Sequence, residues 1–360
     1  MKRSRWSVLA GLLILGGLLS GCVSTVVPPQ IPEMPVTMPD YALVGEANYA
    51  PAFLEDDPYP LFVGARWVYR NAATYWNPQI SASGLMESEV VAVVQGDDAE
   101  CYVLRTHYSN GPDELLYIRR TANQVKLVDA DSDAAAPGAQ STYSLNPGLV
   151  FLQFPLAEDN TWPLVISGAV GRATVYHTEV VAIESGEVRT LLGPTTPIYT
   201  GSWRIHYDLP AAAPRLYGGS PQFLWFAPGV GVVKHVLNSV NYELAEYRRP
   251  DEVVHLEERH AGGIATVDVG EIVIVELRGG APGHKGAWTW ELTDMDGAAL
   301  AALDSDFYAD APQVIRDTEA GTYVFKYRAV DAGDVTLEFE AVHATSGRTE
   351  GPITFRIVVD

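Results

Sequence analysis

Hydrophobic and polar positions alternate along most of this chain with the period of β-strands. Trp203, Ile205 and Tyr207 fall on one face of such a run, and the polar residues between them fall on the other. Short runs rich in Val, Tyr and Leu are separated by turn signals, for example at 96–98 and 109–112. After the first thirty residues, a single turn of helix in 295–303 is the only helix that we expect. The pattern predicts an all-β protein.

Two β-rich blocks follow each other, residues 59–250 and 251–360. The charged, proline-containing segment around Pro250 marks the predicted boundary between two domains. The second block has the length of one β-sandwich.

The first thirty residues have a different pattern. Lys2, Arg3 and Arg5 precede an apolar run at 8–19 that is about 18 Å long if helical, too short for a bilayer core of about 30 Å. This favours a signal peptide over a membrane span. Residues 22–58 contain seven prolines and no sustained apolar period, which predicts an extended tether.

Leu19, Ser20, Gly21 and Cys22 resemble the lipobox of bacterial lipoproteins. The resemblance implies that residues 1–21 are cleaved off and that Cys22 carries lipid, since two or three acyl chains make a stable anchor. We therefore expect an extracytoplasmic protein, lipid-anchored to a bacterial membrane. The alternative is an ordinary secretory signal with a chance cysteine.

Charge and cysteine content limit the kinds of partner and bond that we expect. The formal net charge of −21 disfavours nucleic acid and anionic lipid headgroups. Apart from Cys22 the chain has one cysteine, Cys101, in an apolar run, so we expect a small buried hydrophobic residue and no disulfide.

Catalytic and metal-binding motifs are missing from the sequence. It has no His-Glu-x-x-His, phosphate loop or dinucleotide fingerprint, and no Gly-x-Ser-x-Gly outside the signal peptide. His255 and His260 are five residues apart, which places them on opposite faces of a strand and disfavours a shared metal. Acidic pairs such as Glu257 and Glu258 are typical of a solvated face. We expect neither an enzyme, nor a metal site, nor a cofactor.

The first block resembles a group of bacterial envelope lipoproteins at both of its ends. It begins with an aromatic-Pro-Leu motif at 59–61 and a Trp-x-Tyr at 67–69, and it closes with Trp-Phe-Ala-Pro-Gly-Val-Gly-Val-Val-Lys at 225–234. The resemblance implies a curved antiparallel sheet with Trp67 and Trp225 anchoring its core.

The second block resembles the chagasin family of cysteine-protease inhibitors. The resemblance rests on the alternating run at 264–277 with its Val-Gly-Glu turn, Trp-Thr-Trp-Glu-Leu at 288–292, the Gly-Thr-x-x-Phe-x-Tyr hairpin at 321–333 and the last strand at 353–359. It implies a disulfide-free, immunoglobulin-like β-sandwich.

Chagasin-family proteins place three loops across the active-site cleft of papain-like proteases. The resemblance therefore also implies that three loops of the second block bind a protease. All three loops depart from the family pattern: 283–287 replaces Asn-Pro-Thr-Thr-Gly, the Gly-rich loop is reduced to 317–321, and 342–348 lacks Arg-Pro-aromatic. The residues expected to face a protease are Gly283, His284, Lys285, Gly286, Ala287, Trp288, Ala320, Gly321 and His343.

The sequence leaves two functions open. The first is a surface-anchored lipoprotein that inhibits papain-like cysteine proteases through its C-terminal domain. The second is a non-enzymatic envelope binding or assembly lipoprotein whose sandwich does not inhibit, with an apolar ligand or partner held by 59–250.

Overall fold

The protein is almost entirely β-structure, as the hydrophobic pattern predicts. A computed structural model describes residues 59–72, 84–96, 99–109, 113–132, 143–144, 149–157, 160–168, 173–179, 187–189, 198–200, 202–207, 221–237, 240–310 and 320–360. The predicted signal peptide, Cys22 and the predicted tether lie outside these residues.

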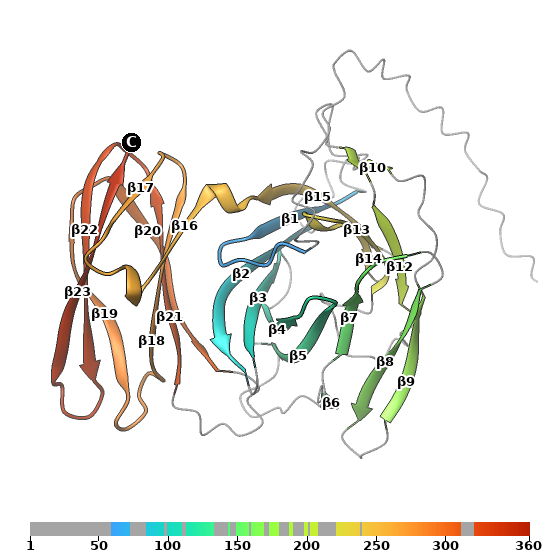
Figure 1. Ribbon diagram of the computed structural model, residues 1–360, viewed down its shortest axis with the longest axis horizontal. Helices are drawn as coiled ribbons and strands as arrows, with labels where there is room; N and C mark the ends of the chain where they lie inside the picture. Colours follow the sequence, from blue (N-terminus) through green and yellow to red (C-terminus); the bar gives the residue numbers. More distant parts are fainter. Residues whose placement is uncertain are drawn as a thin grey trace, which may run out of the picture. The chain divides into compact units, whose positions relative to one another are not determined.

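A large antiparallel sheet occupies the N-terminal block (Figure 1). In space its strands run in the order β6-β8-β9-β12-β13-β14-β15-β1-β2-β3-β4-β5-β7. Their bounds are β1 (Arg66–Asn71), β2 (Leu85–Gln95), β3 (Glu100–Tyr108), β4 (Glu114–Arg120), β5 (Gln124–Ser132), β6 (Tyr143–Ser144), β7 (Leu149–Gln153), β8 (Thr161–Gly168), β9 (Ala173–Glu179), β12 (Trp203–Tyr207), β13 (Pro221–Ala227), β14 (Gly231–Leu237) and β15 (Val240–Arg248). The short strands β10 (Glu187–Arg189) and β11 (Ile198–Thr200) pair with each other.

This sheet curls into a half-barrel, so that side chains near one end of the strand order reach the strand at the other end. Strand β7 is an edge, yet its carbonyls accept hydrogen bonds from two strands near the opposite edge. The Trp162 indole donates to Val150 O at 3.1 Å, and the Tyr207 hydroxyl donates to Phe151 O at 2.5 Å. The predicted curved antiparallel sheet is confirmed.

One apolar core fills the inside of the curl. Trp67, Tyr207 and Phe226 are fully buried in it, and the Trp67 indole donates to Val230 O at 2.7 Å. Trp67 therefore anchors the core as predicted. The prediction for Trp225 holds in part: its neighbour Phe226 on β13 is fully buried, while Trp225 is only partly buried and packs against the core beneath Lys234.

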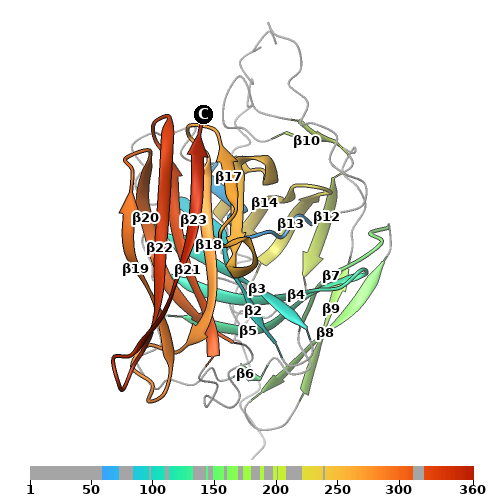
Figure 2. The ribbon, with the colours of Figure 1, turned by 60° about the vertical axis from the view of Figure 1, so that its left-hand side comes forward.

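The C-terminal block is a sandwich of two four-stranded sheets (Figure 2), which confirms the second half of the predicted fold class. One sheet has the order β16-β18-β21-β20 and the other β17-β23-β22-β19. The strands are β16 (Val253–Glu257), β17 (Ile264–Val267), β18 (Ile272–Gly280), β19 (Trp288–Asp296), β20 (Leu300–Ala309), β21 (Ala320–Ala329), β22 (Gly333–His343) and β23 (Thr349–Val359), with the 3-10 turns η2 (Pro250–Glu252) and η3 (Glu258–His260).

The predicted helical turn in 295–303 is wrong. Strands β19 and β20 occupy most of that segment, and Gly297, with a φ of 122°, lies in the connection between them. A Cβ on Gly297 would lie 2.4 Å from Asp334 O, so this connection is packed tightly against the start of β22.

The sheet and the sandwich share a second apolar cluster. Val90 faces into the half-barrel, while Val91, at a β-bulge in β2, packs in one cluster with Ile274 and Val324 of the sandwich. Cys101 is buried in this cluster, as the sequence predicts. Strand β15 ends at Arg248 and β16 begins at Val253, and the independence of the two blocks stays a prediction.

Candidate functional site

Two connections, β18–β19 and β22–β23, lie at one end of the sandwich, opposite the C-terminus (Figure 1), where β20 also ends and β21 begins. Gly280, the last residue of β18, pairs with Ala320, the first of β21, and β20 ends beside them at Ala309. In the other sheet, Trp288 pairs with His343. Topology therefore brings segments 281–287 and 344–348 to the same end as Ala309 and Ala320; we name 281–288 and 342–348 the loop edge.

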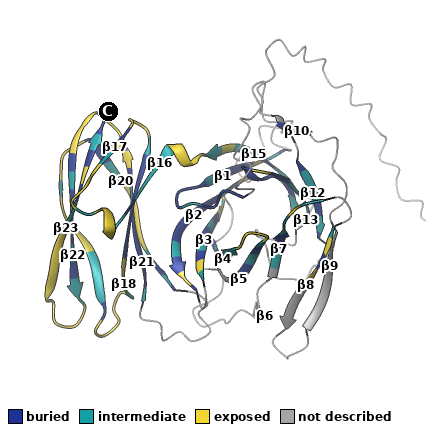
Figure 3. Cartoon of the chain, in the orientation of Figure 1, coloured by how far each residue is buried: buried dark blue, intermediate teal, exposed yellow. Residues whose placement is uncertain are grey.

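Segment 281–287 projects from this end as a small, exposed turn (Figure 3). The amide of His284 donates to Ala281 O at 3.1 Å, and that of Ala287 donates to His284 O at 3.2 Å. Gly283 and Gly286 have φ values of 77° and 85°, a conformation that side chains with a Cβ disfavour. Of the predicted site residues here, Gly283 through Gly286 are exposed and Ala287 is buried.

Backbone and hydroxyl hydrogen bonds join the two halves of the loop edge. Ala344 N donates to Ala287 O at 2.9 Å, and Gly286 N donates to Thr345 Oγ1 at 3.2 Å. These bonds fix the two tips relative to each other before any partner binds.

Trp288 lies half-buried between these tips. His343 meets its ring edge-on with centroids 5.0 Å apart, and the Arg348 guanidinium lies 6.0 Å from the ring centroid. The structure thus brings the predicted residues Trp288 and His343 into contact.

The His343 ring also organises segment 344–348. Its Nδ1 accepts the Ser346 amide at 3.2 Å and lies 2.9 Å from Ser346 Oγ, while its own amide donates to Arg348 O at 2.8 Å. Neither Ser346 nor Arg348 was singled out from the sequence as a contact residue. No local signal marks them, because their contacts depend on how β22 and β23 meet across the turn.

Ala320 and Gly321, the remaining predicted site residues, belong to β21. Gly321 is buried, and a Cβ on it would lie 2.3 Å from the Phe307 ring and 2.4 Å from Tyr308 O. The structure therefore gives Gly321 a packing reason to be glycine. Residues 311–319 lie outside the described residues.

Asp310, which follows β20, links this end of the sandwich to the large sheet. Arg278 makes two hydrogen bonds to Asp310, of 2.8 and 2.7 Å, and the Asp310 carboxylate raises the pKa of this guanidinium. Asp310 also accepts the Gln95 amide at 3.0 Å, and Thr322 donates to Val93 O at 3.0 Å. Strand β2 thereby helps to position this end of the sandwich.

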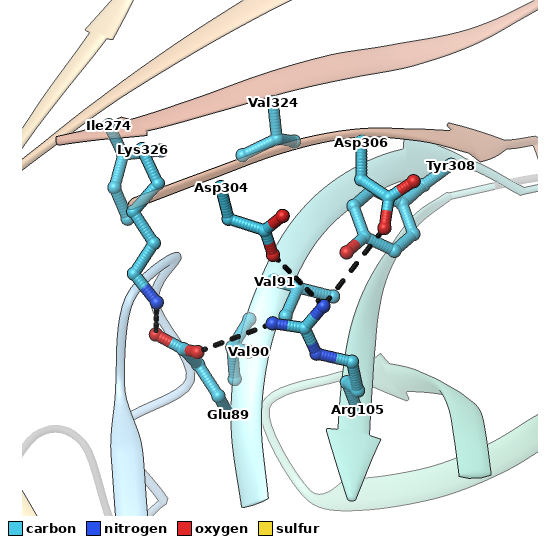
Figure 4. Close-up of a pocket in the computed structure, with 10 residues that line it drawn as sticks. All are labelled: Glu89, Val90, Val91, Arg105, Ile274, Asp304, Asp306, Tyr308, Val324 and Lys326. Atoms are coloured by element: carbon cyan, nitrogen blue, oxygen red, sulfur yellow. Dashed lines mark hydrogen bonds and ion pairs between the residues drawn. The ribbon is translucent and has the colours of Figure 1, made fainter. Parts of the chain in front are cut away.

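A buried carboxylate, Glu89, lies farther along the boundary between sheet and sandwich (Figure 4). It pairs with Lys326 of the sandwich, with Arg248 Nη1 at 3.0 Å and with Arg105 Nη2 at 3.9 Å. Burial lowers the pKa of Lys326, which Glu89 counteracts. The cavity beside this cluster has a volume of about 20 Å³ and holds no more than a water molecule.

The binding-module hypothesis requires an apolar cavity within 59–250. Aromatic side chains fill the described interior of the half-barrel, where Phe151 and Tyr207 stack 5.8 Å apart. A larger hollow of about 490 Å³ lies between sheet and sandwich and is lined mainly by charged residues, among them Arg66, Glu246 and Arg328. Neither feature provides an apolar site.

No group of three or more His, Cys, Asp or Glu side chains in the described part of the chain could hold a metal ion. None of the described helices has the length and hydrophobicity needed to cross a membrane.

The C-terminal block matches a known protein family. The family model described as chagasin family peptidase inhibitor I42 matches residues 266–359. These residues are chagasin-like. The match confirms the predicted resemblance and covers every element of the loop edge. A search of curated proteins found no match.

Solved structures with local similarity include a cysteine protease inhibitor from Entamoeba histolytica. The solution structure of amebosin shares 20% identity over 29% of this chain and 96% of its own, with a TM-score of 0.24. The cysteine protease inhibitor EhICP2 from Entamoeba histolytica shares 12% identity over 30% of this chain and 96% of its own, with a TM-score of 0.26. PbICP-C, solved in complex with falcipain-2, shares 14% identity over 31% of this chain and 92% of its own, with a TM-score of 0.19.

Proposed function

We propose that this protein inhibits papain-like cysteine proteases through the loop edge of its chagasin-like region. The observation that carries the proposal is the family match at 266–359, together with the loop edge that those strands form around the half-buried Trp288.

The geometry suits a wedge that enters a narrow cleft. Hydrogen bonds from Ala344 to Ala287 and from Gly286 to Thr345 hold the tips in place, so little ordering entropy opposes binding. Gly283 and Gly286 present little more than backbone, which allows close approach to a catalytic cysteine. Trp288 supplies the aromatic anchor that carries much of the energy in such interfaces.

Replacing Trp288 with Ala tests this assignment. We expect inhibition of papain by the mature protein to weaken by about 2 kcal/mol or more, roughly thirtyfold, because a hot-spot aromatic is lost. Stability should change less, since the residue is only half-buried at the end of a strand. Inhibition constants from substrate hydrolysis and a thermal melt measure the two effects.

Trp290 provides the matched control on the same strand face. It packs against the sandwich core and its indole donates to Arg278 O at 2.7 Å, so Trp290→Ala should lower the melting temperature more than Trp288→Ala. Because Trp290 is only partly buried, the loss should stay below the ~3–5 kcal/mol of a core Trp. If the wild-type protein does not inhibit papain-like enzymes even at high micromolar concentration, the inhibitor function is refuted and the binding-module hypothesis replaces it.

We further propose that the protein acts outside the cell from a lipid anchor on Cys22. The support is the lipobox-like sequence at 19–22 after a short apolar run. Cys22→Ser should release the protein from membranes or leave the precursor uncleaved, as detergent-phase partitioning would show. Membrane association unaltered by this substitution would contradict the proposal.

A further inference from the structure

Positive charge gathers on the loop edge of an otherwise acidic protein. Lys285 and Arg348 lie on its two tips beside His284 and His343, and neither 281–288 nor 342–348 contains a carboxylate. The whole chain has a formal net charge of −21. The sign of the edge is thus opposite to that of the body that carries it.

These cations are available to a partner. Lys285 is exposed, and no ion pair of its ammonium group is found among the described residues. Arg348 pairs with Glu350 at 2.9 Å, but its side chain is 71% exposed and such surface pairs contribute little. The bonds that join the two tips also keep both cations at the same end of the sandwich.

We propose that the loop edge selects papain-like proteases whose cleft is bordered by carboxylates. This inference rests on the proposed inhibitory function and names the class of target. A protease with an acidic cleft border is repelled by most of the inhibitor's surface and attracted only by its loop edge. The electrostatic field of the inhibitor therefore orients the protease for productive binding. A protease with a basic cleft border is attracted to the acidic body and repelled by the edge.

Association rates measured with two proteases test the proposal. The mature protein is mixed with one papain-like protease whose cleft border is acidic and one whose border is basic, at ionic strengths from about 0.02 to 0.5 M. We expect faster association with the acidic-bordered enzyme, and a rate that falls as salt screens the attraction. Lys285→Glu should slow this association roughly tenfold at low salt and have little effect at high salt.

Arg328→Glu is the matched control because it makes the same change in net charge at the other end of β21. Arg328 is exposed and pairs with Ile272, at the start of β18. We expect this variant to keep the wild-type rate, and circular dichroism should show both variants folded.

Four outcomes would overturn the inference. Equal slowing by Lys285→Glu and Arg328→Glu would mean that only net charge matters. A rate independent of salt, or faster association with the basic-bordered enzyme, would refute the selection of acidic borders while leaving inhibition intact. Inhibition of neither enzyme by the wild-type protein would refute the proposed function, and this inference with it.

Discussion

At the scale of single residues, burial changes the pKa of His235. It lies within the half-barrel strand β14 with the Tyr69 ring centroid 5.0 Å away and that of Tyr242 5.2 Å away. Burial lowers its pKa from 6.5 to about 3, because the imidazolium loses its hydration there. In the unfolded chain the same side chain has an ordinary pKa.

This difference makes the fold sensitive to acid. Between pH 6.5 and about 3 the unfolded His235 binds a proton that the folded one does not. The free energy of unfolding should therefore fall with decreasing pH, by up to about 1.4 kcal/mol per pH unit from this group. Urea unfolding of wild type and His235→Phe from pH 7.5 to 4 measures it. The same pH slope in both proteins would show that His235 does not contribute.

The contact of β2 with β21 shows at the scale of elements how the blocks are joined. Glu89 of β2 faces cations from three strands: Arg105 of β3, Arg248 of β15 and Lys326 of β21. Buried charges of this kind are stable only as a paired set, since each has lost its hydration.

Glu89→Gln should therefore be strongly destabilising. It leaves three cations near each other without their shared carboxylate, and we expect a loss of about 3–5 kcal/mol in chemical denaturation. Asp334→Asn is the control, because Asp334 pairs with Arg356 on the surface at 2.8 Å and should cost less than about 1 kcal/mol. Similar losses in both variants would contradict a structural role of burial at Glu89.

The contact between sheet and sandwich governs behaviour at the scale of the whole molecule. Ile272, Ile274, Tyr308 and Val324 of the sandwich are buried in the cluster shared with the large sheet. Most of this cluster consists of aliphatic side chains, so separating the blocks would expose an apolar face on each.

The isolated block 251–360 tests how independent the sandwich is. We expect it to fold cooperatively without sensitivity to reductant, since it has no cysteine, but to self-associate through the exposed face. Sedimentation at several concentrations should show association that Ile274→Thr with Val324→Thr reduces, whereas Val330→Thr, at an exposed position, does not. A broad, non-cooperative melt would mean that the two blocks share one core.

The sequence by itself determined the features that depend on local periodicity. Alternation at 203–207 and along 264–277 predicts strands because side chains on a strand turn to opposite faces, and the order of motifs in 266–359 predicts the chagasin-like sandwich. The boundary segment at Pro250 falls between the last strand of the sheet and the first of the sandwich.

Only the tertiary structure decided which faces meet. In the folded protein Phe226 is fully buried and Trp225 only partly. Glu89 pairs with cations of other strands, and the Arg348 guanidinium lies over the ring of Trp288. These contacts join residues far apart in the chain, or on the two sides of a turn, and depend on strand register and on the curl of the sheet. A single sequence contains no short-range signal for either, because the same alternation is compatible with many pairings.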